Sequence, residues 1–175
     1  LSFNANKIIT TGAGGCLLTS SKKYAKLALH ISTTSKVLHP WLLKHDKLGW
    51  NIRMPSLNAA LGYNKIKEFN KIIIKKKKIA QSYFSLFKNT EINLLKEGTN
   101  CKSNFWLNTV LLNDEQIKFR NKIIEYCNKK GLGCRPAWNL ISDIAIYKKC
   151  PKTNLSNAIK IQKKIISLPS GLNIL

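Results

Sequence analysis

Hydrophobic residues recur at helical spacing in four parts of the chain. The longest pattern covers residues 55–87 and opens on Pro55, a residue suited to the first turn of a helix. A shorter helix is predicted from the serine cap at residues 20–21 to about Ile31. A third is predicted for residues 113–130, where glycines end it. The last is predicted to run from residue 154 or 156 until just before Pro169, with inward positions at Ile159, Ile165 and Ile166.

Other segments are predicted to be extended or irregular. Residues 8–11 and 16–19 are short apolar or β-branched runs beside the turn Gly12-Ala13-Gly14-Gly15, which predicts a hairpin or a bent strand pair. The aromatic and β-branched content of residues 105–112 predicts a strand, and residues 134–138 are also predicted to be extended. Residues 32–54 lack any period and indicate a long structured loop, a kind of segment that often carries function. The C-terminal elements together predict a small α/β domain.

Composition fits a globular protein that lies outside the membrane. The 175 residues are 44% hydrophobic and 22% charged, and no apolar run approaches the roughly 18 residues that a spanning helix needs. The five cysteines are odd in number, irregular in spacing and without a C-x-x-C pair, and the three histidines form no zinc-like pattern with them. We therefore expect free thiols, a cytoplasmic location and no metal site.

The formal net charge of +22 raises the hypothesis of a basic, non-enzymatic nucleic-acid-binding module. However, the basic residues are nearly all lysines, and only Arg53, Arg120 and Arg135 are arginines. Proteins that read nucleic-acid sequence favour the flat, bidentate fork of arginine. The lysine excess accompanies an excess of isoleucine and asparagine, as a bias of the coding sequence would produce. Solvated lysine faces are therefore the preferred interpretation, and nucleic acid is not an expected partner.

The first residues contain the most specific motif, Ser2-Phe3-Asn4-Ala5-Asn6-Lys7-Ile8-Ile9-Thr10-Thr11-Gly12-Ala13-Gly14-Gly15. It lacks the Gly-Lys-Ser/Thr ending of a phosphate-binding P-loop, and no G-x-G-x-x-G fingerprint opens a helix. A lysine beside a glycine turn is unremarkable by itself. The whole segment, however, resembles the S-F-N-x-N-K-x-x-T-T-G-x-G-G signature of DegT/DnrJ/StrS-type sugar aminotransferases.

Further blocks extend this resemblance over nearly the whole chain. Residues 45–54, HDKLGWNIRM, resemble the family's H-D-x-x-G-Y-N-Y-R-M block, and residues 57–62, LNAALG, resemble the helix opening that follows it. Near the C-terminal end, the resemblance is to the LegC-like branch, which aminates sugars for bacillosamine-like and legionaminic-type glycans. The residues that carry it are Arg135-Pro136-Ala137-Trp138, Tyr147, Cys150-Pro151 and Leu168-Pro169-Ser170.

The resemblance implies a fold and a chemistry. The fold would be the C-terminal part of the aspartate-aminotransferase-like α/β fold, the fold type I of transferases that use pyridoxal 5'-phosphate. Lys7 would be the catalytic lysine that holds this cofactor as a Schiff base, and it would later move a proton between substrate and cofactor. Ser2 would bind the cofactor phosphate, and Asn51 would reach the phosphate of the neighbouring subunit's cofactor in a homodimer with shared active sites. The reaction would transfer an amino group, from glutamate as donor, to a nucleotide-linked 4-keto-6-deoxy sugar.

Substrate contacts follow from a physical argument as well as from the motifs. A chain that uses lysine almost everywhere keeps Arg53 and Arg135 inside motif blocks, where a bidentate fork can hold a carboxylate, a diphosphate or a loop carbonyl. A structural tie and a substrate contact remain open for both arginines. Trp138 is a candidate for stacking on a sugar or base, with a wall residue as its alternative. Ala5 and Ala13 stand where the family commonly has glycine, so the turn is expected to be altered if it needs positive φ there.

The resemblance also predicts how the chain is organised. Residues 1–54 would be the tail of the cofactor-binding large domain, residues 55–88 a long interdomain helix, and residues 89–175 the small C-terminal α/β domain. Family members carry a long N-terminal half before this lysine, so the chain is expected to be a partial product and inactive alone. The alternative enzyme is a perosamine-type aminotransferase that acts on a different nucleotide sugar.

Overall fold

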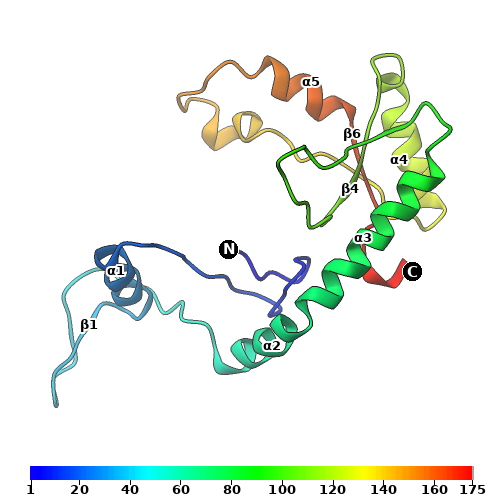
Figure 1. Cartoon of the computed structure of the whole chain (residues 1–175). Coiled ribbons are helices and arrows are strands. Elements are labelled where there is room, and N and C mark those ends of the chain that lie inside the picture. Colours follow the sequence, from blue (N-terminus) through cyan, green and yellow to red (C-terminus); the bar gives the residue numbers. More distant parts are fainter. Residues whose placement is uncertain (175) are drawn as a thin grey trace. The chain divides into compact units, whose positions relative to one another are not determined.

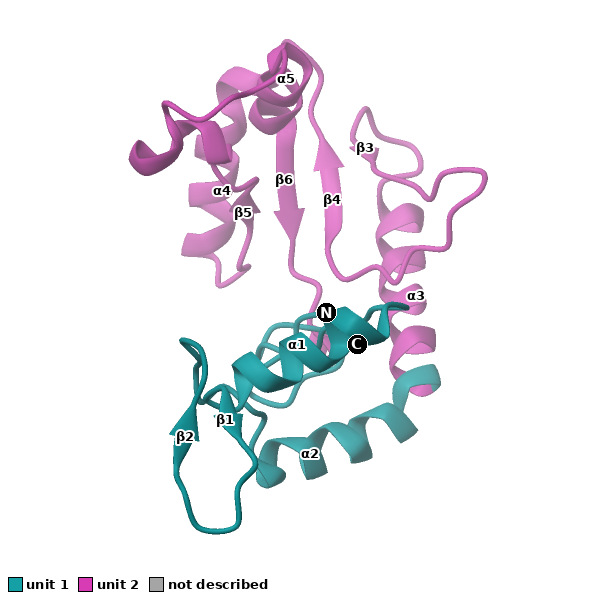
Figure 2. Ribbon diagram, turned by 90° about the vertical axis from the view of Figure 1, so that its left-hand side faces the viewer, with its two compact units in different colours: residues 1–70 teal, residues 71–175 magenta. Residues whose placement is uncertain are grey.

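A computed structural model of the chain describes residues 1–174. The chain divides into two compact units, residues 1–70 and residues 71–175, which Figure 2 shows in teal and magenta. Each unit is described by itself. Within residues 1–174, no helix is long and apolar enough to cross a membrane.

The first unit contains two helices and a short hairpin, in blue and cyan in Figure 1. Helix α1 (Lys22–Ser32) begins after Ser21, whose hydroxyl accepts a hydrogen bond from the Tyr24 N–H, so the predicted helix and its serine cap are confirmed. Strands β1 (Lys36–Val37) and β2 (Lys44–His45) pair antiparallel inside the predicted loop. Helix α2 (Ser56–Lys67) follows Pro55, which occupies the N-cap position rather than the first turn.

The predicted pairing of residues 8–11 with residues 16–19 is wrong. The bridge instead joins Ser2 to Gly15. Gly12 and Gly14 adopt φ values of +82° and +101°, so the chain reverses before Cys16 and returns beside the first three residues. Sequence patterns missed this pairing because residues 1–3 show no alternation of their own, and the partner of a strand is set by the turn.

The predicted helix of residues 55–87 is two helices, α2 and α3 (Phe69–Leu86), separated at Glu68. No proline or glycine marks this break. Helix α2 buries Gly62, whereas α3 buries Ile72, Lys76, Ile79 and Ala80. The apolar residues of α2 and of α3 thus belong to two separate helices, each with its own buried face. Hydrophobic spacing alone does not distinguish two such helices from one long helix.

The second unit is built on an antiparallel sheet with the strand order β3-β4-β6-β5 (Figure 2). The strands are β3 (Asn93–Leu94), β4 (Asn108–Leu111), β5 (Arg135–Pro136) and β6 (Ile165–Leu168). Strands β4 and β6 pair over their whole length, with Asn108 opposite Leu168 and Leu111 opposite Ile165. The buried core of this unit contains Val110, Leu112, Cys134 and Ile166, with Ile92, Leu94, Ile124, Cys127 and Leu168 packed against it.

Two helices and several 3-10 turns complete the second unit. Helix α4 (Arg120–Lys129) begins later than the predicted helix of residues 113–130. Asn113 and Gln116 exchange hydrogen bonds in the turn before it, a 3-10 turn at Ile117–Phe119 follows, and Phe119 is the N-cap of α4. Further 3-10 turns are Ile141–Asp143, Ala145–Tyr147 and Leu172–Ile174. Helix α5 (Ser156–Lys164) is shorter than predicted, because Ile165 and Ile166 belong to β6. These β-branched residues pack better in the sheet, where Ile166 is buried, than in another helical turn.

Candidate functional site

Residues 1–16 fold back on themselves and carry both Ser2 and Lys7. The Phe3 N–H donates to the Gly14 carbonyl at 2.9 Å, and the Cys16 N–H donates to the Leu1 carbonyl at 3.0 Å. A Cβ at Gly15 would lie 2.5 Å from the Leu1 carbonyl oxygen, so only glycine allows the two arms to approach this closely. The resulting loop is fixed by its own backbone.

Lys7 belongs to the segment that connects the two paired arms, residues 1–3 and 14–16. Its backbone N–H donates to the Asn4 carbonyl at 3.0 Å, and its side chain is partly buried. Ser2 is exposed, and its hydroxyl accepts a hydrogen bond from the Asn4 N–H at 3.4 Å. Asn4 therefore links the two residues, and the loop presents a primary amine and a hydroxyl from one short segment.

The expected distortion at the two alanines does not occur. Gly12 and Gly14 carry the positive φ angles of this turn, while Ala5 and Ala13 lie outside the left-handed region. Thr11 also stabilises the turn, since its hydroxyl donates to the Ala13 carbonyl. The alanines are compatible with the loop because neither occupies a position that needs glycine.

Helix α2 contacts this loop at Thr11. The Asn58 side-chain N–H donates to the Thr11 carbonyl at 2.6 Å, and Thr11 is only 3% exposed. Gly62, one turn further along α2, faces the Thr11 methyl group. Asn58 is not among the site residues predicted from the sequence. Its place in the helix opening of the family motif is the signal that points to it.

The loop of residues 32–54 carries Asn51 and Arg53, and backbone hydrogen bonds fix its ends. Asn51 forms an isolated antiparallel bridge with Thr33, and the neighbouring N–H groups of Trp50 and Ile52 donate to the carbonyls of Ile31 and Ser32 at 2.8 and 3.1 Å. The Asn51 and Arg53 side chains are exposed. The structure thus holds the backbone of Asn51 rigidly while its amide faces outward.

A hydrogen bond from α1 and a close approach of two backbone segments reinforce this geometry. His30 Nε2 lies 2.5 Å from the Asp46 carboxylate, and this hydrogen bond lowers the pKa of Asp46. Ser35 is fully buried with a φ of +53°, and a Cβ at Gly49 would lie 2.6 Å from the Ser35 backbone nitrogen. Gly49 is therefore required by the close approach of two backbone segments.

In the second unit, Arg135 acts as a tie. Its Nη1 donates to the Asn128 side-chain oxygen at 2.8 Å and to the Cys134 carbonyl at 3.1 Å. Asn128 in turn donates to the Cys134 carbonyl at 2.9 Å. This network connects α4 to β5, which is the structural alternative considered for this arginine. Because Arg135 is exposed, its remaining N–H donors are accessible to a ligand.

Trp138 is 69% exposed, and its ring stacks on that of Trp106 with a centroid distance of 6.0 Å and an interplanar angle of 17°. Trp106 directly precedes the segment that enters β4. Trp106 is not among the site residues predicted from the sequence, because stacking partners 32 residues apart leave no spacing signal. Trp138 thus has an aromatic contact on one side and an accessible surface.

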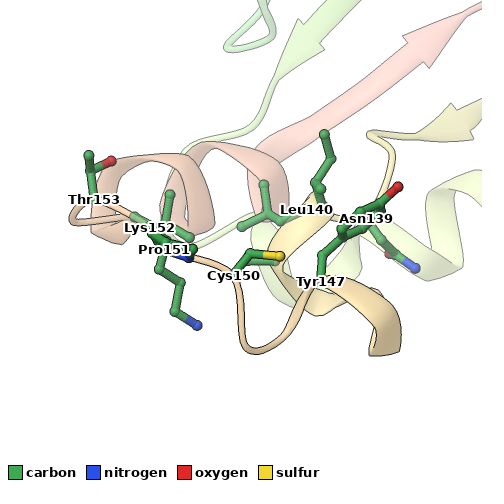
Figure 3. A pocket seen from close by; sticks show the side chains of 10 residues that line it. Asn139, Leu140, Tyr147, Cys150, Pro151, Lys152 and Thr153 are labelled. Atoms are coloured by element: carbon green, nitrogen blue, oxygen red, sulfur yellow. The ribbon is translucent and has the colours of Figure 1, made fainter.

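A cavity of about 820 Å³ opens immediately after Trp138 in the sequence. Figure 3 shows Asn139, Leu140 and Tyr147 on one side of it, Pro151, Lys152 and Thr153 on the other, and Cys150 between them. The motif residues Tyr147, Cys150 and Pro151 thus line one cavity. Its walls are mostly apolar, which is typical of sites that bind organic ligands.

Among residues 1–174, no group of three or more His, Cys, Asp or Glu side chains is arranged to hold a metal ion. All five cysteines, which lie within these residues, are free thiols. The structure brings Ser2, Lys7, Asn51 and Arg53 into the first unit, and Arg135 and Trp138 into the second.

Comparison with solved structures identifies the fold. Helicobacter pylori PseC, an aminotransferase involved in the biosynthesis of pseudaminic acid, superposes on 99% of this chain with a TM-score of 0.90 and 22% identity, and 47% of its own length is covered. The aminotransferase TlmJ from Streptoalloteichus hindustanus covers 98% with a TM-score of 0.88 and 16% identity, at 46% of its own length. The α/β fold predicted from the sequence, the C-terminal half of fold type I sugar aminotransferases, is thereby confirmed.

Curated sequences give the same picture. GDP-perosamine synthase of Vibrio cholerae is 27% identical over 172 residues, which are 97% of this chain and 46% of the relative. The UDP-4-amino-4,6-dideoxy-N-acetyl-beta-L-altrosamine transaminase of Campylobacter jejuni is 28% identical over 171 residues, at 96% and 46% coverage. The chain thus spans about half the length of the curated relatives it matches. The DegT/DnrJ/EryC1/StrS aminotransferase family matches residues 1–174, and the chain belongs to this family.

Proposed function

We propose that this chain forms part of a pyridoxal-phosphate-dependent aminotransferase that aminates a nucleotide-linked 4-keto-6-deoxy sugar, with glutamate as the donor, for surface glycan synthesis. The observation that carries the proposal is the position of Lys7 on the closed, glycine-dependent loop of residues 1–16 in a member of this family. Enzymes of this family use pyridoxal phosphate.

The residues present fit this cofactor. A primary amine is the group that reacts with its aldehyde, and Lys7 supplies one from a backbone-fixed position. A neutral hydroxyl is suited to hydrogen bonding with phosphate oxygens, and Ser2 supplies one on the same loop. When bound, pyridoxal phosphate supplies the electron sink for the reaction.

The roles proposed for this chain's residues follow from that fit. Lys7 Nζ would hold the cofactor covalently, and once free it would act as the base that takes the proton from the substrate carbon. The Ser2 hydroxyl and the Asn51 amide donate to phosphate oxygens. Arg53 and Arg135 bind the anionic parts of the substrate, and Trp138 contributes a flat apolar surface.

Asn51 is proposed to act across a homodimer interface. Its backbone is pinned to Thr33 while its side chain is exposed, so the amide is fixed in place and accessible to a second subunit. Because the chain spans about half the length of its relatives, we also propose that a complete site needs a segment equivalent to their other half. The first unit exposes the apolar side chains of Leu17, Leu18 and Leu29. This supports the proposal, because the additional segment would bury them.

Two substrate assignments are retained. The LegC-like reading rests on the motif residues Tyr147, Cys150 and Pro151, which line the cavity in the second unit. The perosamine-type reading is supported by the similarity to GDP-perosamine synthases of Vibrio cholerae and Escherichia coli, 27% and 28% identical. Offering a UDP-linked and a GDP-linked 4-keto-6-deoxy sugar to the same preparation separates the two assignments.

The test of the proposed function compares two proteins. One is the 175-residue chain, and the other is the chain joined to the segment encoded upstream of Leu1 or, where none is encoded, to the N-terminal half of the Vibrio cholerae relative. After incubation with pyridoxal phosphate and borohydride, peptide mass spectrometry should find the pyridoxyl group on Lys7 of the joined protein. The chain alone should show no adduct and no amino transfer.

Lys7→Ala in the joined protein is the matched control and should leave no adduct while folding is retained. An adduct on any other lysine would remove the assignment of Lys7. Stable adduct formation with turnover by the 175-residue chain would show that no further segment is needed.

A further inference from the structure

The second unit contains a buried lysine for which the proposed chemistry has no use. Lys76 lies on α3 and is only 6% exposed. Its Nζ donates to the carbonyls of Trp106, at 3.2 Å, and Ser170. Desolvation lowers its pKa, as burial of a cation does. Because burying an ammonium group is costly unless its donors are satisfied, the position of these two carbonyls is closely linked to that of Lys76.

The two carbonyls belong to segments that flank the central strands. Trp106 lies two residues before β4, and Ser170 lies two residues after β6. The Ser170 hydroxyl accepts hydrogen bonds from the backbone and side-chain N–H groups of Asn108 at 2.9 and 3.0 Å. The Tyr83 hydroxyl, also from α3, donates to the Pro169 carbonyl at 2.8 Å. Helix α3 therefore bonds to the segments at both strand ends through the side chains of Lys76 and Tyr83. Of these contacts, only one made by Lys76 reaches Trp106.

The contact with Trp106 has a consequence beyond the sheet. The Trp106 ring stacks on Trp138, and Trp138 is the most accessible aromatic candidate for substrate contact in this unit. A hydrogen bond to the Trp106 carbonyl restricts the backbone from which that ring projects. Lys76 is therefore hydrogen-bonded to the residue whose ring stacks on Trp138.

We propose that Lys76 is a positioning residue that sets the Trp106–Trp138 stack as a platform for the base of the nucleotide-sugar substrate. Flat π surfaces accept any nucleobase by stacking, and a second indole behind the first keeps the platform from turning away. The ligand rests on the proposed function, whereas the link between Lys76 and the stacked pair rests on the geometry alone.

The link is tested by circular dichroism of the chain, in which two stacked indoles give an exciton couplet. The Trp138→Phe spectrum identifies the couplet by subtraction. Lys76→Met should lose it, Lys76→Arg should retain part of it, and Lys77→Met, which changes an exposed neighbour on the same helix, should leave it unchanged. Tyr83→Phe removes the other anchor of α3 and should also preserve the couplet.

If Lys76→Met does not fold, the comparison of Lys76→Arg with Tyr83→Phe decides the matter. A changed couplet in Lys76→Arg together with an unchanged one in Tyr83→Phe supports the positioning role. A full couplet in the folded Lys76 variants, or an equal loss in Tyr83→Phe, would overturn it, because the stack would then depend on general packing.

The platform is tested with UDP and GDP, which carry the base and diphosphate without the sugar. Titration followed by tryptophan fluorescence should show binding to the unaltered chain and to Lys77→Met, with a Kd about tenfold higher in Lys76→Met and Trp138→Phe, as loss of one base–aromatic stack implies. Lack of binding by both the unaltered chain and the joined protein would overturn the platform. That result would leave amino transfer intact, because the Lys7 adduct tests it separately.

Discussion

The Cγ2 methyl group of Thr11 occupies the space that a side chain at Gly62 would need. A Cβ built at Gly62 would stand 2.7 Å from that methyl, well inside van der Waals contact. Thr11 belongs to the turn that follows Lys7, and Gly62 is the buried residue of α2. The helix therefore approaches the loop of Lys7 to a distance that glycine alone permits.

Gly62→Ala should consequently destabilise the chain. In most helix interiors this change stabilises by about 0.5–1 kcal/mol, because alanine restricts the unfolded chain. Here the methyl contact should reverse the sign and cost about 1–3 kcal/mol, as overpacking does. Thr11→Ser removes the methyl but keeps the hydroxyl bond to Ala13, so the double variant should recover stability.

Urea unfolding of the four proteins measures this coupling. Gly133→Ala serves as the control, because a Cβ at Gly133 meets nothing within 4 Å. A Gly62→Ala chain as stable as the unaltered one would show that α2 and the loop can separate at little cost.

Asn58→Ala should weaken the same contact by another route. It removes the 2.6 Å hydrogen bond to the Thr11 carbonyl and leaves that buried acceptor without its side-chain partner, at a cost of about 1–3 kcal/mol. Amide exchange should become faster within residues 1–16, as measured by mass spectrometry after proteolysis. Asn64→Ala, an exposed change on the same helix, should leave exchange unaltered. Equal exchange in both variants would contradict an anchoring role for Asn58.

Local signals predicted local structure well. The Ser21 cap of α1 and the strand at Asn108–Leu111 both follow from residues that lie next to each other in the sequence. The predicted secondary structure was wrong where a contact with a residue distant in the sequence determines it. Ile165 and Ile166 fit a helical pattern, but the neighbouring strand β4 draws them into the sheet.

The same distinction applies to the candidate site. The motifs picked out Lys7 and Ser2, which the structure places on one hydrogen-bonded loop. Asn58, Trp106 and Lys76 act through contacts with residues 30 or more positions away, at Thr11, Trp138 and Ser170. Such contacts leave no periodicity, so only three-dimensional structure reveals them. The roles assigned to the individual site residues remain predictions.

Cys134 should make the chain sensitive to alkaline pH. Burial, with a further contribution from Cys127, raises the pKa of Cys134 from 9.0 to about 11. The folded state keeps this thiol protonated at a pH where the unfolded chain has already lost the proton. The free energy of unfolding should therefore fall as pH rises from about 9 to about 11, and the contribution of this thiol is fully present below that range.

Comparison with Cys134→Ala isolates this effect, because the other titrating groups are common to both proteins. The unaltered chain should lose more stability than the variant between about pH 8, below the unfolded-state pKa, and about pH 10.5, most of the way to the folded-state pKa, whatever constant penalty the small cavity adds. Cys101→Ala, at an exposed thiol, should retain the slope of the unaltered chain. Parallel slopes for the unaltered chain and Cys134→Ala would show that this thiol ionises without a folding cost.

The last prediction concerns the shared site of the proposed homodimer. In the joined protein, Lys7→Ala and Asn51→Ala should each lower activity, the first to background because no other group replaces its amine. If Asn51 binds the cofactor phosphate of the neighbouring subunit, a mixed dimer has one site with both changes and one with neither. Mixing the two variants under conditions that exchange subunits should then restore up to roughly half the activity per dimer, since one of two sites is intact.

A Lys7→Ala and Arg53→Lys pair is a useful comparison, as it tests whether a second residue of the same loop also acts across the interface. If the mixed dimers form and show no activity above the average of the two parents, Asn51 serves the site of its own subunit. The pinned bridge between Asn51 and Thr33 makes either result interpretable, because the backbone of residue 51 is held by hydrogen bonds that the alanine change does not remove.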